Sequence, residues 1–129
     1  MLTRKPRFSP EAELERNIVD LFAGSGMFVM NQVTCPAGRA DIVTKNSIIE
    51  CKDELTRTTL QQAIGQLSLY RPHLNPRAQL AIICNLSRVP HMHRFARKSG
   101  VEVFEWPEIK QNVDAILCSP PFSKPRRKK

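Results

Sequence analysis

Apolar residues recur along this chain with two different periods. Over residues 10–23 and 59–71 they return every three or four positions, which is the spacing of one buried helix face. A similar spacing covers 90–99 and, less clearly, 108–117. Short runs rich in β-branched residues predict strands at 27–33, 40–43, 47–52, 78–84 and 101–105. This order of elements predicts an α/β domain whose mixed central sheet is flanked by helices on both faces.

The two longer helices carry sequence signals at their ends. Ser9 followed by Pro10 is typical of an N-cap with proline at the first helical position. Thr59 with Gln62 three residues later predicts a capping box at the start of the second helix. Pro72 predicts that this helix ends at the residue before it. The second helix is therefore expected to follow the third strand after a short polar link.

Charged residues lie inside a predicted hairpin that spans residues 38–53. Its strands are joined at 44–46, where an asparagine favours a turn. Glu50 and Lys52 share a strand face because they are two residues apart, and the hairpin folds Asp41 back alongside them. Two carboxylates and a lysine are costly to place there without a cation or a charged ligand. Oxygen ligands without a thiol or imidazole suit Mg²⁺ or Mn²⁺.

An E-x-K sequence by itself is common on solvated strand faces, so its meaning depends on the neighbouring residues. Gln62, Gln66 and Tyr70 recur every four residues and form a polar stripe beside the apolar face of the second helix. That stripe is placed to meet a phosphate backbone. Arg39, two residues before Asp41, is a further candidate for a substrate contact.

With these elements the chain resembles the PD-(D/E)XK nuclease superfamily, in the branches that carry a Q-xxx-Y helix. The residues that carry the likeness are Asp41, Glu50-Cys51-Lys52 and Gln66 to Tyr70. The likeness spans about residues 9–106 and implies a restriction-endonuclease-like core of order α-β-β-β-α-β-α-β. Ala40 replaces the proline of the motif, which is not a ligand.

The resemblance implies a metal-dependent endonuclease that hydrolyses DNA phosphodiester bonds and leaves a 5′-phosphate. Asp41 and Glu50 would hold one or two Mg²⁺ or Mn²⁺ ions together with the backbone carbonyl of Cys51. Lys52 would orient the attacking water or help to deprotonate it. Two alternatives stay open: a nucleic-acid-binding module of the same fold that does not cleave, or a nuclease subunit that depends on a partner.

The resemblance also implies a further catalytic acid from the first helix, which would bind a metal ion or a metal-bound water. We favour Glu15, because its spacing to the following apolar residues is similar to that in archaeal Holliday junction resolvases. Glu11, one turn earlier on a similar face, is the alternative. Acidic residues in a first helical turn are also common for electrostatic reasons alone.

Size and charge set further limits. The chain has 129 residues, which predicts one domain over 9–118 between a basic arm at 1–8 and a disordered basic tail at 119–129. The formal charge is +8, and the last six residues supply five of it. This surplus favours a polyanion such as DNA. The tail residues expected to contact phosphates are Lys124, Arg126, Arg127, Lys128 and Lys129.

Cysteine usage and hydropathy exclude other classes. The four cysteines have neither zinc-ligand spacing nor the pattern of a disulfide framework, which predicts reduced thiols. No apolar run reaches the ~18 residues of a membrane span. We therefore expect a soluble, cytoplasmic protein with DNA as its partner, and a homodimer or larger homo-oligomer stays open. The sequence does not indicate which DNA structure or base sequence is preferred.

Overall fold

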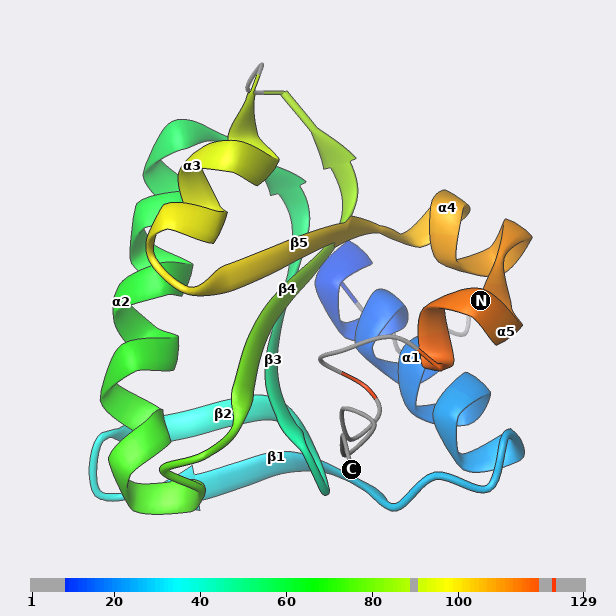
Figure 1. Cartoon of the computed structure of the whole chain (residues 1–129), viewed down its shortest axis with the longest axis horizontal. Coiled ribbons are helices and arrows are strands. Elements are labelled where there is room, and N and C mark those ends of the chain that lie inside the picture. The colour runs from blue at the N-terminus through cyan, green and yellow to red at the C-terminus, as the bar shows by residue number, and fades with distance from the viewer. Residues whose placement is uncertain (1–8, 89–90, 119–121, 123–129) are drawn as a thin grey trace, which may run out of the picture.

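A computed structural model of the chain describes residues 9–88, 91–118 and 122. It has one central sheet with helices on both faces (Figure 1). The strands are β1 (Val29–Cys35), β2 (Gly38–Thr44), β3 (Ser47–Leu55), β4 (Gln79–Ser87) and β5 (Val101–Glu105). The helices are α1 (Pro10–Gly24), α2 (Arg57–Leu74), α3 (Met92–Lys98), α4 (Trp106–Gln111) and α5 (Val113–Leu117).

The sheet is mixed, as the sequence predicted. Its strands lie in the order β1-β2-β3-β4-β5. The first three are antiparallel neighbours, whereas β3, β4 and β5 run parallel to one another through the α2 and α3 crossovers. The predicted α/β class is therefore confirmed.

Two apolar cores lie on opposite faces of the sheet. One face is covered by α2 and α3, and the other by α1 together with α4 and α5 (Figure 1). The alternation along β3 divides its side chains between them: Ile48 lies in the α2 core, and Ile49 and Cys51 lie in the α1 core. Each fully buried aliphatic side chain contributes about 1.5–3 kcal/mol to folding. The two cores together hold β3 at the centre of the domain.

Helix α1 begins as predicted, but α2 differs from the prediction at both ends. The Ser9 hydroxyl accepts the Ala12 N–H at 3.1 Å and caps α1. In α2 the capping box is Thr56 with Thr59, not Thr59 with Gln62: each hydroxyl accepts the other residue's backbone N–H, at 2.8 and 3.2 Å. The helix therefore starts one turn closer to β3 than expected.

The predicted end of α2 before Pro72 is also wrong. The helix continues to Leu74 with the proline inside its last turn. A proline there removes one backbone hydrogen bond, but Leu74 packs against the α2 core. The Asn75 N–H then closes the helix on the Arg71 carbonyl at 3.0 Å. Packing of the final turn compensates for the missing hydrogen bond.

Other boundaries shift because pairing extends the strands. β1 starts two residues later than predicted and runs to Cys35, which pairs with Gly38 across a short turn. β3 and β4 are longer than predicted because their parallel pairing continues to Leu55 and Ser87. The weak helix expected at 108–117 is replaced by two short helices, α4 and α5.

Phe122, which was predicted to belong to the disordered tail, is buried. Its ring lies 5.3 Å from that of Phe22 and 5.1 Å from that of Phe104, measured between centroids. The aromatic contacts extend the α1 core. The remaining arm and tail positions lie outside the described residues. In the described ranges, none of the helices combines the length and apolar character needed to cross a bilayer.

Candidate functional site

The β2–β3 hairpin brings two acids together. Ile42 pairs with Ile49, which places Asp41 and Glu50 on adjacent strands. Asp41 Oδ2 accepts the backbone N–H of Cys51 at 2.9 Å, and Glu50 Oε1 accepts the backbone N–H of Asp41 at 3.3 Å. Each carboxylate thus binds the backbone of the opposite strand. The hairpin fixes the positions of both acids.

Glu50 is the most perturbed acid of the pair. Its side chain is only 3% exposed. Burial, the charge of Asp41 and a side-chain hydrogen bond with Asp41 raise its pKa to about 8, although Lys52 acts in the opposite direction. Near neutral pH the pair therefore keeps a proton that a bound cation would displace.

Lys52 and Cys51 lie on opposite sides of β3. Lys52 is half-buried and close enough for its charge to lower the pKa of Glu50. The thiol of Cys51 is buried in the α1 core, where burial and then the charges of Asp41 and Glu15 raise its pKa. Because such a thiol is a poor nucleophile, the backbone of Cys51 is the part of this residue that the site can use.

Of the two candidate acids on α1, Glu15 is the one linked to the hairpin. Its carboxylate accepts Gln32 Nε2 at 2.7 and 2.9 Å and Asn31 Nδ2 at 3.3 Å. The same Gln32 nitrogen lies 3.5 Å from Asp41 Oδ1. Glu11 is exposed, and its effect on the Cys51 pKa is smaller than that of Glu15. One amide group thus joins the helix acid to the hairpin acid.

Sequence reasoning did not find Gln32. Its φ of +54° lies in the left-handed region, which a residue other than glycine rarely adopts. The β1–β2 register pairs Asn31 with Ile42 and Val33 with Ala40, and the ladder is interrupted between them, at Gln32 opposite Asp41. The positive φ of Gln32 and its contacts could not be inferred from the sequence, because both depend on how α1 packs beside β1.

Tyr70 lies next to the acids, but within the core. Its side chain is 4% exposed and covers Gly38, where an added Cβ would lie 3.3 Å from the ring. Burial, followed by the charges of Glu50 and Asp41, raises its pKa, and a backbone hydrogen bond from Arg39 acts against this rise. Gly38 has a φ of +138°, so glycine is needed there on both counts. Tyr70 therefore packs under the β1–β2 turn.

The rest of the predicted polar stripe on α2 is divided between interior and surface. Gln66 lies one turn before Tyr70, and its Oε1 is buried without a hydrogen-bond partner among the described residues. Such an atom destabilises the fold by about 1–3 kcal/mol unless something binds it. Gln62 and Arg39 are exposed. The predicted tail contacts at positions 124 and 126–129 lie outside the described residues.

The donor set limits which cation could bind here. Within the described ranges, no three histidine, cysteine, aspartate or glutamate side chains come together as a metal cluster. Two side-chain carboxylates, Asp41 and Glu50, and the Cys51 carbonyl would be available, and Glu15 is linked to Asp41 through the Gln32 amide. Mg²⁺ keeps several waters and needs few protein ligands, so this set fits Mg²⁺ better than Zn²⁺.

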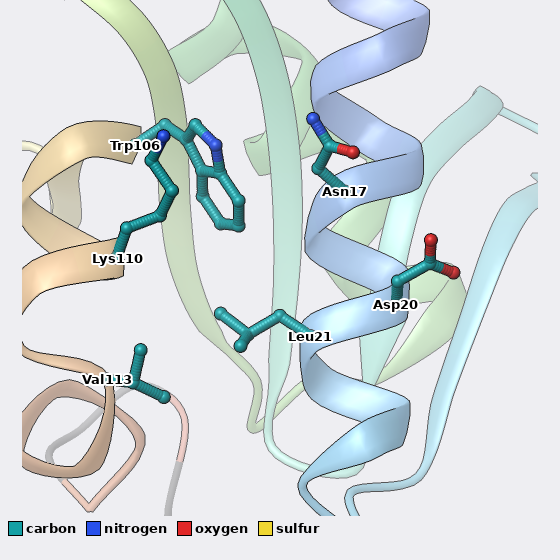
Figure 2. A pocket seen from close by; sticks show the side chains of 6 residues that line it. All are labelled: Asn17, Asp20, Leu21, Trp106, Lys110 and Val113. Carbon is teal, nitrogen blue, oxygen red and sulfur yellow. The ribbon is translucent and has the colours of Figure 1, made fainter.

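Two hollows flank α1. One, of about 310 Å³, lies between α1 and β1 and is lined by Ala12, Glu15, Arg16, Val19, Asn31 and Gln32. The other, of about 670 Å³, lies between α1 and the α4–α5 pair, where Trp106 points toward α1 and Lys110 runs beside Trp106 (Figure 2). The second hollow contains no predicted site residue. The first hollow shares Glu15 with the candidate site.

Comparisons with known proteins bear on the fold alone. No family model matches the chain, and no curated protein matches it. Among solved structures, the crystal structure of a protein of unknown function, AF1548, is similar with a TM-score of 0.60 and 15% sequence identity. The match covers 89% of this chain and 71% of that chain. At this identity the likeness supports a shared α/β architecture and carries no activity.

Proposed function

We propose that this protein is a metal-dependent endonuclease that hydrolyses phosphodiester bonds in DNA. The observation that carries the proposal is the burial of Glu50 against Asp41, which raises the pKa of Glu50 to about 8. Two buried acids in contact destabilise a fold unless a cation or another positively charged group binds them. Perturbed acids of this kind concentrate at functional sites. The motif residues Asp41, Glu50 and Lys52 are the ones that meet here.

Each residue of the candidate site would have a separate role in catalysis. Asp41 and Glu50 would hold Mg²⁺ with the Cys51 carbonyl. When bound, Mg²⁺ supplies Lewis-acid polarisation of the phosphate and a bound water of lowered pKa. Lys52, a compact charge next to Glu50, would orient that water and offset the charge that develops on the phosphate. Glu15 would bind a cation directly or hold a cation-bound water.

The helix after β3 would place the DNA strand. Gln66 would use its buried carbonyl to accept a hydrogen bond from the water or from a nucleotide amine, which would satisfy an atom that has no partner among the described residues. Exposed Arg39 and Gln62 would contact phosphates nearby. Tyr70 would support Gly38 and so keep the hairpin in place. The formal charge of +8 favours binding to a polyanion without selecting a sequence.

A cleavage assay tests this proposal. Purified protein is incubated with supercoiled plasmid, single-stranded DNA and a four-way junction, with Mg²⁺, with Mn²⁺ or with a chelator. We expect cleavage of at least one substrate with either cation and none with the chelator, and Asp41→Ala or Lys52→Ala should be inactive but still bind. Binding without cleavage of any substrate would favour the non-cleaving module. Nicked and linear plasmid products would distinguish a single active site from a paired one.

A further inference from the structure

The Gln32 amide lies between Glu15 and Asp41, two of the acids proposed to bind the cation. Its nitrogen is 2.7 and 2.9 Å from the two oxygens of Glu15 and 3.5 Å from Asp41 Oδ1. A Mg²⁺ ion binds carboxylate oxygens at about 2.0–2.1 Å. The amide nitrogen and an ion on these oxygens therefore compete for nearly the same space.

The backbone of Gln32 is strained in this position. A φ of +54° carries a cost of about 1–2 kcal/mol for a residue with a side chain. Across the sheet, the strand pairing is interrupted at this point, opposite Asp41. The short contacts of the amide with Glu15, at 2.7 and 2.9 Å, are strong enough to offset a cost of this size. If the amide left, β1 could relax and complete its ladder.

There is room for the side chain to move. The hollow of about 310 Å³ beside Gln32 is open to solvent and is lined by Ala12, Arg16 and Val19 from α1. At ~30 Å³ per water, it could accommodate a displaced amide together with several waters. Gln32 itself is exposed, so withdrawal disturbs no packed core.

We propose that Gln32 is a built-in occupant of the cation site, held between Glu15 and Asp41 without metal and displaced into the adjacent hollow when a divalent cation binds. This inference rests on the proposed function, because it assumes that the acids bind a cation. The amide offers partial positive charge to both acids and so keeps them close together in the metal-free protein. The same contacts lower the affinity for the cation, because they must be broken first.

The test measures Mn²⁺ binding by calorimetry and requires no catalysis. Gln32→Ala removes the amide, and Gln32→Gly also removes the strain because glycine adopts a positive φ freely. Thr34→Ala, at an exposed position of the same strand, is the matched control. We expect both Gln32 variants to bind Mn²⁺ about tenfold more tightly than wild type, which corresponds to one charge-assisted hydrogen bond that no longer has to be broken. Thr34→Ala should bind like wild type.

Thermal melting supplies a second readout. Without metal, Gln32→Ala should melt below wild type because Glu15 and Asp41 no longer share a donor. With saturating Mn²⁺ the difference should disappear. In a Glu15→Gln background, Gln32→Ala should change Mn²⁺ affinity much less, because the charge-assisted hydrogen bonds between the Gln32 amide and the Glu15 carboxylate are already lost.

The outcomes separate this inference from the proposed function. Weaker Mn²⁺ binding in Gln32→Ala would make Gln32 a ligand and overturn the inference, as would affinities equal to that of Thr34→Ala. Either result leaves the nuclease proposal intact. If folded wild type and both Gln32 variants all fail to bind Mn²⁺, the cation site itself is wrong, and the proposed function fails with it.

Discussion

Two glutamates on the same face of β3 differ in every respect that bears on function. Glu50 is 3% exposed, lies against Asp41 and has a pKa raised to about 8. Glu54, four residues further along, is exposed and pairs with Arg88 at 3.0 Å, which lowers its pKa. Glu54 is thus neutralised by an arginine at the surface. Glu50 lies beside a second acid instead, and we expect this difference where a fold has a cation-binding site.

A similar contrast exists on α2. The carbonyl of Gln66 is buried and lacks a partner among the described residues, whereas Gln62, one turn earlier, is exposed. Two glutamines on one helix thus differ in whether their polar atoms are buried without a hydrogen-bond partner. Matched substitutions at Glu50 and Glu54, and at Gln66 and Gln62, test whether the unpaired member of each pair is the functional one.

The largest effect is expected from neutralising the inner glutamate. Glu50→Gln should slow cleavage by at least ~10³-fold, because it removes a proposed ligand of the cation that would stabilise the transition state. Glu54→Gln makes the same change of charge on the same strand and should stay within about twofold. Rates are compared at saturating Mg²⁺. Similar reductions in both variants would contradict the distinction between the two ends of β3.

The next effect concerns stability as a function of pH in the absence of metal. The pKa of Glu50 is about 8 in the folded state against an ordinary value of 4.5, so between these values the folded chain holds a proton that the unfolded chain has released. Stability should therefore fall as pH rises through this window. At pH 8, Glu50→Gln should be more stable than wild type by on the order of 2–4 kcal/mol.

Urea unfolding of metal-free protein at pH 5 and pH 8 checks this second prediction. The Glu54→Gln control should instead be less stable than wild type at pH 8. The lowered pKa of Glu54 means that its charged form stabilises the fold at pH values above the ordinary pKa of a glutamate. A wild-type stability that rises between pH 5 and pH 8, with no gain in Glu50→Gln, would mean that Glu50 is not protonated in the fold.

A smaller effect is expected at Gln66. Gln66→Ala should slow turnover at saturating DNA about tenfold by misplacing the strand. It should also raise the free energy of unfolding by about 1 kcal/mol, since a buried oxygen without a partner is removed. Gln62→Ala should change neither quantity. Normal turnover in Gln66→Ala, measured under single-turnover conditions, would limit this residue to a role in packing.

The smallest effect on chemistry is expected from the basic tail. Deleting residues 124–129 should weaken DNA binding and flatten the slope of log K against log salt by up to ~0.9 for each phosphate that the tail neutralises in wild type. Maximal turnover should be unchanged, because the deletion leaves every proposed cation ligand in place. Binding measured at two salt concentrations checks this, and an unchanged slope would show that the tail does not bind phosphates.

Much of the fold could be predicted because it follows from local periodicity. The strands around Asp41 and Glu50 were found from their β-branched runs, and the hairpin from its turn residues. The errors arose where distant contacts decide the outcome. Leu74 packs against the α2 core and carries the helix past Pro72. Phe122 is held by aromatic rings that are far away in sequence.

The candidate site was predicted in part for the same reason. Asp41, Glu50 and Lys52 lie on neighbouring strands of one hairpin, so their proximity follows from local pairing. The burial of Tyr70 under Gly38 and the bridge formed by Gln32 depend on how helices pack beside the sheet. A sequence pattern contains no signal for either contact.

Exchange of the divalent cation tests the central claim most directly. DNA cleavage and DNA binding are measured on the same wild-type sample with Mg²⁺, with Ca²⁺ and with a chelator. Because Ca²⁺ is larger and coordinates more loosely, we predict binding with little or no cleavage in Ca²⁺, full cleavage in Mg²⁺ and none after chelation. Cleavage that survives thorough chelation would contradict the assignment of Asp41 and Glu50 to a cation site.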